Sequence, residues 1–168
     1  MTSKSNVADV TKILNELFAI ENPDVLQKHL DKYKSALKST KAIDSMITQM
    51  GRKSDTRSAS DARVRLNCAQ ALDTAGKKAK RAIPMLIDII KNPDEDIQIR
   101  TLCVSTIGRM GKQALGVVPL LIVIGQNPDE DDGFRKVCAE ALVELGYPKE
   151  FSIESSVFPP SSMDCRLI

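Results

Sequence analysis

The side chains best able to act as a nucleophile or to bind a metal ion are the cysteines and the histidine. The chain has four cysteines and one histidine among its 168 residues. A zinc site needs about four nitrogen or sulfur ligands, and His29 has no second histidine with which to share a metal. Cys68, Cys103 and Cys138 are spaced 35 residues apart. This spacing favours a repeated structural position, in which a small apolar thiol packs in the core, over a catalytic or metal-binding role.

A basic cluster and an uneven distribution of charge form the second chemically suggestive pattern. Residues 1–91 carry 17 Lys and Arg against 10 Asp and Glu, whereas residues 92–168 carry 7 against 12, so the net charge of +2 conceals two halves of opposite sign. One short segment concentrates the positive charge: Lys77, Lys78, Lys80 and Arg81. Such a cluster can contact phosphates or act as a nuclear import signal. The 4% aromatic content and the acidic second half favour a solvated turn instead.

The evenly spaced cysteines belong to an internal repeat of 35 residues, which is the period expected of helical repeat proteins. The loops Asn92–Asp96 and Asn127–Asp131 have the same sequence, Asn-Pro-Asp-Glu-Asp. Other residue types recur at the same spacing: Arg65, Arg100 and Arg135; Leu72, Ile107 and Leu142; Gly76, Gly111 and Gly146; Pro84 and Pro119. The middle of the chain therefore consists of units with one common structure.

Each unit is expected to contain two helices. In the central unit Ile99, Cys103, Ile107 and Met110 fall on one face of a helix, and Gly111 ends it because glycine readily adopts the left-handed conformation. A second helix is expected over about 113–125. Proline near its middle disfavours a continuous helix, so this helix either begins near the proline or is kinked there.

The units at 94–111 and 129–146, and more loosely the segment 64–76, resemble HEAT-like repeats of the short type found in phycobilisome lyases. The resemblance implies an all-α fold: a short right-handed α-solenoid of HEAT-like helix pairs. It also implies that a loop aspartate and the arginine six residues later hydrogen-bond between neighbouring repeats. The pairs with this separation are Asp94 with Arg100 and Asp129 with Arg135, and we expect them to be structural.

Four segments follow from these patterns. Residues 1–51 are expected to form a divergent N-terminal helical cap or repeat, 52–61 a polar connection, 62–146 the repeats of period 35, and 147–168 a flexible tail rich in proline and serine. The sequence Cys165-Arg166-Leu167-Ile168 resembles a prenylation box, although an aliphatic residue is usual where Arg166 stands. No run of eighteen apolar residues is apparent, so we expect a cytoplasmic protein that meets a membrane only if Cys165 is prenylated.

The second helices give the strongest indication of binding. Ile83, Leu86, Ile87 and Ile90, with Val118, Leu121 and Ile122, are expected in the core, yet further apolar residues remain on these helices. They are Met85, Ile89, Leu120, Val123 and Ile124. An apolar stripe across adjacent units predicts a concave groove for a partner helix or peptide. The sequence thus favours a non-catalytic protein-interaction adaptor without a cofactor. The alternatives are a nucleic-acid-binding HEAT-like module that uses the basic half, and a bilin lyase-type chaperone subunit.

Overall fold

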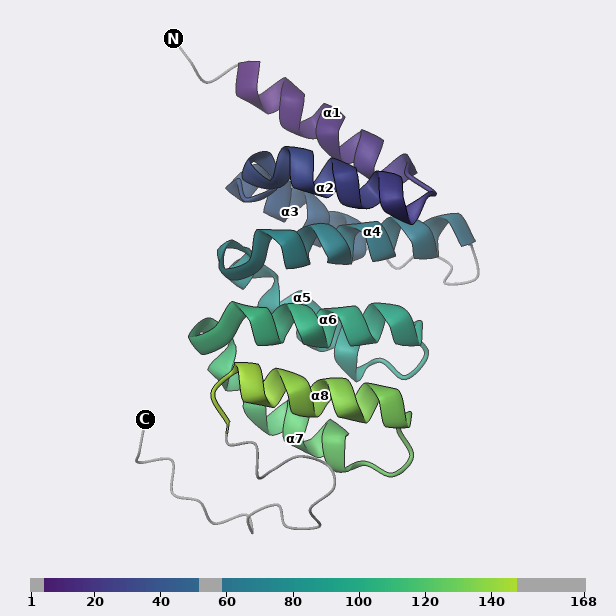
Figure 1. Ribbon diagram of the computed structural model, residues 1–168, viewed down its shortest axis with the longest axis vertical. Coiled ribbons are helices and arrows are strands. Elements are labelled where there is room, and N and C mark those ends of the chain that lie inside the picture. The colour runs from purple at the N-terminus through teal and green to yellow at the C-terminus, as the bar shows by residue number, and fades with distance from the viewer. Residues whose placement is uncertain (1–4, 52–58, 148–168) are drawn as a thin grey trace.

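The computed structural model describes residues 5–51 and 59–147, and throughout this part of the chain the regular elements are helices (Figure 1). The α-helices are α1 Ser5–Ala19, α2 Pro23–Leu37, α3 Thr40–Met50, α4 Ala59–Ala75, α5 Ile83–Lys91, α6 Ile97–Met110, α7 Val118–Gln126 and α8 Asp132–Glu144, with 3₁₀ turns η1 Gly76–Ala82 and η2 Gly111–Val117. The all-α prediction is confirmed. Because α4 begins at Ala59, the end of the polar connection expected over 52–61 belongs to a helix.

The helices lie in two rows (Figure 1). One row holds α2, α4, α6 and α8, which run in the same direction, and the other holds α3, α5 and α7 behind them. Neighbours in the first row pack directly on one another, α5 packs against α6, and α7 packs against α8. Helix α1 covers one end of the stack and contacts α2, α3 and α4. The loops that precede α2, α6 and α8 therefore share one edge of the molecule, and the turns η1 and η2 share the opposite edge.

Side-chain caps explain where α2, α6 and α8 begin. The Asn22 side-chain oxygen accepts hydrogen bonds from the first free backbone N–H groups of α2. Asp96 does the same for α6, where its carboxylate accepts from the N–H groups of Gln98 and Ile99 at 2.8 and 3.3 Å. Asp131 caps α8. Each cap satisfies backbone donors that have no partner within the helix, and the Asn-Pro-Asp loops therefore define the common edge.

The prolines mark the start of the second helices. Pro84 and Pro119 lie in the first turns of α5 and α7, where a missing N–H costs no helical hydrogen bond. The start expected near residue 113 is wrong, because residues 111–117 form the 3₁₀ turn η2, and the alternative that the helix begins near the proline is confirmed. Gly111 has φ 61° and ends α6, as its position predicted.

The helical run from Ile97 to Gln126 is long and apolar enough to cross a membrane by length and composition. We expected no such segment from the sequence and did not identify this run. Within the structure this run is not one helix. The positive φ of Gly111 and the non-helical Ala114 separate α6 from α7, and the chain turns back between them. Ile99, Cys103, Ile107 and Met110 are buried along α6, so the apolar character of this helix serves the core.

Candidate functional site

The apolar residues expected to line a groove on the second helices differ in exposure. Val123 is 65% exposed, and Met85 and Leu120 are half-buried. Ile89 and Ile124, at 6% and 7%, are buried, so their assignment to a groove is wrong. The reason is the register of the second helices. These two residues share the core-facing side of α5 and α7 with Leu86, Ile90 and Leu121, whereas Ile83, Ile87, Val118 and Ile122 are only half-buried.

An exposed apolar patch nevertheless remains on α7. Leu120 and Val123 are three residues apart and therefore lie on one side of the helix. We call these two residues the α7 patch. Met85 occupies the position on α5 that corresponds to Leu120. Two neighbouring apolar side chains are a small surface, but Val123 is more exposed than any other large apolar residue in the described part of the chain.

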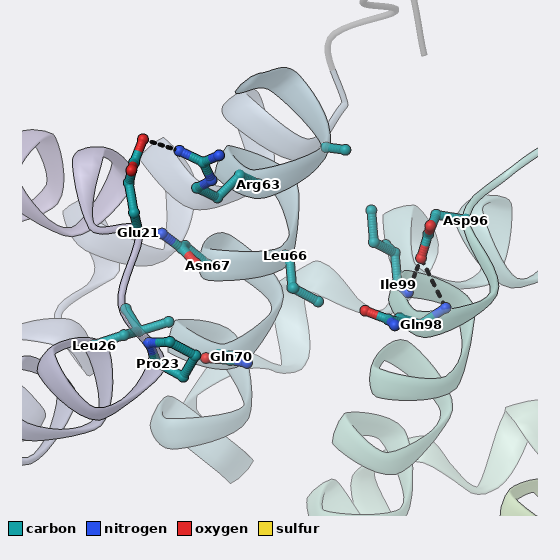
Figure 2. A pocket seen from close by; sticks show the side chains of 11 residues that line it. Glu21, Pro23, Leu26, Arg63, Leu66, Asn67, Gln70, Asp96, Gln98 and Ile99 are labelled. Atoms are coloured by element: carbon teal, nitrogen blue, oxygen red, sulfur yellow. Dashed lines mark hydrogen bonds and ion pairs between the residues drawn. The ribbon is translucent and has the colours of Figure 1, made fainter. Parts of the chain in front are cut away.

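A pocket of about 280 Å³ lies on the other row, where α2, α4 and α6 begin (Figure 2). Its lining residues are Glu21, Pro23, Leu26, Ala62, Arg63, Leu66, Asn67, Gln70, Asp96, Gln98 and Ile99. Figure 2 shows Leu66 of α4 between Glu21 and Arg63 on one side and Asp96, Gln98 and Ile99 on the other. Residues from three helices thus meet at a site that sequence reasoning missed, because the pocket depends on how the rows stack.

Some polar side chains of this pocket already form hydrogen bonds or ion pairs, and others do not. Asn67 donates to the backbone carbonyl oxygens of Leu17 and Ile20, both at 2.9 Å, and ties α4 to the end of α1. Arg63 forms an ion pair with Glu21. The side-chain amides of Gln70 and Gln98 have no hydrogen-bond partner in the described part of the chain. The lining contains no cysteine, serine or histidine.

Buried arginine–glutamate pairs connect successive units. The guanidinium of Arg100 donates to both carboxylate oxygens of Glu130, at 2.9 and 2.6 Å, and its Nε donates to the carbonyl oxygen of Ile90. One unit earlier, Arg65 donates to both carboxylate oxygens of Glu95, one of them at 2.9 Å. Each arginine thus reaches the loop of the following unit. A fork-shaped guanidinium matches a carboxylate at two points, which fixes the spacing of the units.

The loop aspartates are therefore not the partners of these arginines, and the predicted pairs Asp94–Arg100 and Asp129–Arg135 are wrong. Both aspartates are exposed, and their backbone N–H groups donate to the preceding asparagine side chains at 3.1 Å. Arg135 donates to Gly125 and to Asp132. The 35-residue register contained the correct signal, because Glu95 and Glu130 recur at the same position as well.

The basic cluster lies at the opposite edge from the pocket. Lys77, Lys78, Lys80 and Arg81 are all exposed on η1, while Ala79 and Ala82 hold the turn in the core. Arg81 forms an ion pair with Asp44 of α3 at 3.3 Å, and both side chains are about half exposed. The turn η1 also contacts η2, which carries the exposed Lys112. The exposed basic side chains of η1 and Lys112 of η2 therefore form a solvated, positively charged edge of the molecule. We call these five residues the cationic edge.

The remaining candidates for chemistry have structural surroundings. Cys68, Cys103 and Cys138 are fully buried, and burial raises the pKa of the Cys103 and Cys138 thiols to about 12. Burial also raises the pKa of the Cys68 thiol. His29 makes a hydrogen bond with the carbonyl oxygen of Ile13 at 3.2 Å. In the described ranges, no group of three His, Cys, Asp or Glu residues is placed to hold a metal ion.

Three predictions fall wholly or mostly on residues that the structure does not describe: the polar connection over 52–58, the tail beyond Tyr147 and the prenylation box at Cys165. The geometry thus offers the α7 patch, the pocket and the cationic edge as candidate binding surfaces. Comparison of the chain with protein-family models, curated proteins and solved structures finds no match.

Proposed function

We propose that this protein is a short right-handed α-solenoid of HEAT-like helix pairs that acts as a non-catalytic protein-interaction adaptor. The two rows of helices, the 35-residue register and the Arg–Glu pairs between successive units support the solenoid. Repeat proteins of this kind present side chains from successive units on one extended surface. Their usual activity is the binding of another protein.

The observation that carries the adaptor function is the α7 patch. Val123 exposes 65% of its surface on a helix whose other side is packed, with the half-buried Leu120 one turn before it. Apolar side chains grouped on a helix surface are typical of contact sites for an amphipathic helix or peptide. Met85 extends the same kind of surface to the preceding unit. The partner we expect is therefore a helix or peptide segment with apolar anchors.

The test is a comparison of the unmodified protein with Met85→Glu and Leu120→Glu. We expect a peptide selected from a displayed library against the unmodified protein to bind Leu120→Glu at least about tenfold more weakly, because a carboxylate would be desolvated in the contact. Binding of a hydrophobic dye should fall as well. Unchanged affinity and dye binding in both variants would overturn the proposal.

A second candidate function is nucleic-acid binding, which the cationic edge favours. The four basic side chains of η1 are exposed together, and Lys112 lies on the adjoining turn. Contacts to phosphates release counterions, so affinity for a duplex oligonucleotide should fall steeply with salt and should weaken further in Lys77→Glu and Lys80→Glu. Affinity that is absent or insensitive to both changes would exclude this function.

A further inference from the structure

We infer that the pocket between α2, α4 and α6 is a second binding site, and that it accepts a peptide that inserts one apolar side chain and carries a lysine or arginine beside it. The site lies on the first row of helices, away from the α7 patch. It consists of different residues, and its ligand does not depend on the proposed function. If both sites are occupied, the adaptor would bridge two partners.

The size of the pocket limits its ligand. A volume of about 280 Å³ lies just below the usual range for small-molecule sites and suits a single large side chain. Leu26, Leu66 and Ile99 line it with apolar surface, and Leu26 and Ile99 are themselves buried. An apolar side chain of the partner would lose its contact with water there, which is the main source of affinity at such anchors.

The charge around the pocket determines which residues of the partner can lie next to its inserted apolar side chain. Arg63 is neutralised by its ion pair with Glu21, which leaves Asp96 as the acidic lining residue without a cationic partner in the described part of the chain. Asp24 and Asp94 lie exposed in the adjoining segments. The negative potential of these carboxylates favours a lysine or arginine beside the inserted side chain.

The free amides supply contacts to a peptide backbone. Gln70 of α4 and Gln98 of α6 both line the pocket, and each side chain offers a donor and an acceptor. An extended peptide presents N–H and C=O groups that would otherwise lose hydrogen bonds to water. Amides from two neighbouring helices can therefore hold a peptide in register, which a purely apolar pocket would not do.

Two exposed apolar residues lie next in the chain to residues that line the pocket. Val25 of α2 is 51% exposed and follows two residues after the lining residue Pro23, and Ile97 of α6 is 41% exposed between Asp96 and Gln98. The described part of the chain has only one other large apolar side chain of this exposure, Val123. Exposed apolar side chains at these positions favour a peptide as the ligand, because a peptide extends past its anchor.

The test uses nuclear magnetic resonance with the full chain and a blocked peptide that has one leucine between two lysines. A second peptide with glutamates in place of the lysines controls for charge. We expect the lysine peptide to shift the side-chain amide signals of Gln70 and Gln98 at millimolar concentration, and the glutamate peptide to bind about tenfold more weakly. Equal binding of both peptides, or no shift of these amides by either, would overturn the inference.

Two pairs of variants then locate the site. Asp96→Asn keeps a good helix cap and removes one charge, and Asp131→Asn makes the same change at α8, away from the pocket. The lysine peptide should bind Asp96→Asn about two- to fivefold more weakly and Asp131→Asn unchanged. Ala62→Leu fills the pocket and should weaken binding by about tenfold or more, whereas Ala139→Leu on α8 should not. Equal effects within both pairs would place the peptide elsewhere and contradict the inference.

Discussion

Arg100 and Glu130 join α6 to the loop that precedes α8. Two parallel hydrogen bonds of 2.9 and 2.6 Å connect the guanidinium to the carboxylate, and the Arg100 side chain is only 6% exposed. The guanidinium also lies over the ring of Phe134, 4.3 Å from its centre. The Arg65–Glu95 pair repeats the two-point contact with a glutamate one unit earlier, so this ion pair recurs with the 35-residue period.

The first prediction is that the glutamate, and not the neighbouring aspartate, stabilises this contact. Glu130→Gln leaves the charge of Arg100 buried without compensation and should lower the free energy of unfolding by about 3 kcal/mol. Asp129→Asn, one residue earlier and exposed, should change it by less than about 0.5 kcal/mol. Urea unfolding of both variants measures the difference. Equal losses, or a larger loss in Asp129→Asn, would restore the aspartate as the partner.

The second prediction concerns the close approach of α6 and α8. A Cβ atom at Gly108 would lie 3.1 Å from Cα and 3.2 Å from Cβ of Ala141. Gly108→Ala should therefore push the helices apart and lower the free energy of unfolding by about 1–3 kcal/mol. Gly116 in η2 has open space around it, and Gly116→Ala should cost nothing measurable beyond its backbone effect. A thermal melt of Gly108→Ala that matches the unmodified protein would contradict this packing.

The third prediction is a pH dependence at Asp73, which forms an ion pair with Arg109 at 2.7 Å. Burial raises the pKa of its carboxyl above 3.8; Arg109 lowers this pKa and Glu144 raises it further. One carboxylate oxygen is buried without a hydrogen-bond partner. The folded state therefore holds the Asp73 proton more tightly than the unfolded state, and this carboxyl makes the free energy of unfolding fall as pH rises from 3.8 through its folded pKa.

Asp73→Asn removes that dependence. The stability of the variant relative to the unmodified protein should rise across this pH window, because only the unmodified protein must bury a developing charge. Urea unfolding at a series of pH values measures the slope of the difference. If the stability of the variant relative to the unmodified protein falls as pH rises, the Arg109 contact lowers the pKa of the Asp73 carboxyl more than burial raises it, and the prediction is contradicted.

The fourth prediction is that the repeat cysteines do not react in the folded protein. The thiolate is the reactive form, and the Cys103 and Cys138 thiols combine a pKa of about 12 with full burial. Iodoacetamide at about pH 8 should leave peptides with Cys68, Cys103 or Cys138 unlabelled until denaturant is added. Rapid labelling of any of the three in the folded protein, read by mass spectrometry, would contradict their place in the core.

Periodicity in the sequence predicted much of the fold. The spacing of Ile99, Cys103 and Ile107 indicated a buried helix face, and Gly111 indicated its end, because both signals depend on local backbone geometry. The same period aligned Arg65 with Arg100. It did not identify the partners of these arginines, since that choice depends on the distance between units and not on the spacing within one.

The candidate sites were harder to predict for the same reason. In the sequence, Ile89 and Val123 are both apolar residues of the second helices beyond those assigned to the core. In the structure Ile89 is buried and Val123 is exposed. Their environments depend on where α5 and α7 begin and on which first helix each of them contacts. The pocket around Leu66 and Gln98 is formed by three helices from different units, so no local pattern could indicate it.

The adaptor function is tested most directly by the affinity of a library-selected peptide for two matched variants, measured by isothermal titration calorimetry. Val123→Glu on α7 and Ser35→Glu near the end of α2 each add one negative charge at an exposed helical position, and Ser35 lines neither the α7 patch nor the pocket. We predict that Val123→Glu weakens binding by about tenfold or more and that Ser35→Glu leaves it unchanged within about twofold. Undiminished affinity in Val123→Glu would contradict the proposal that the α7 patch binds the partner.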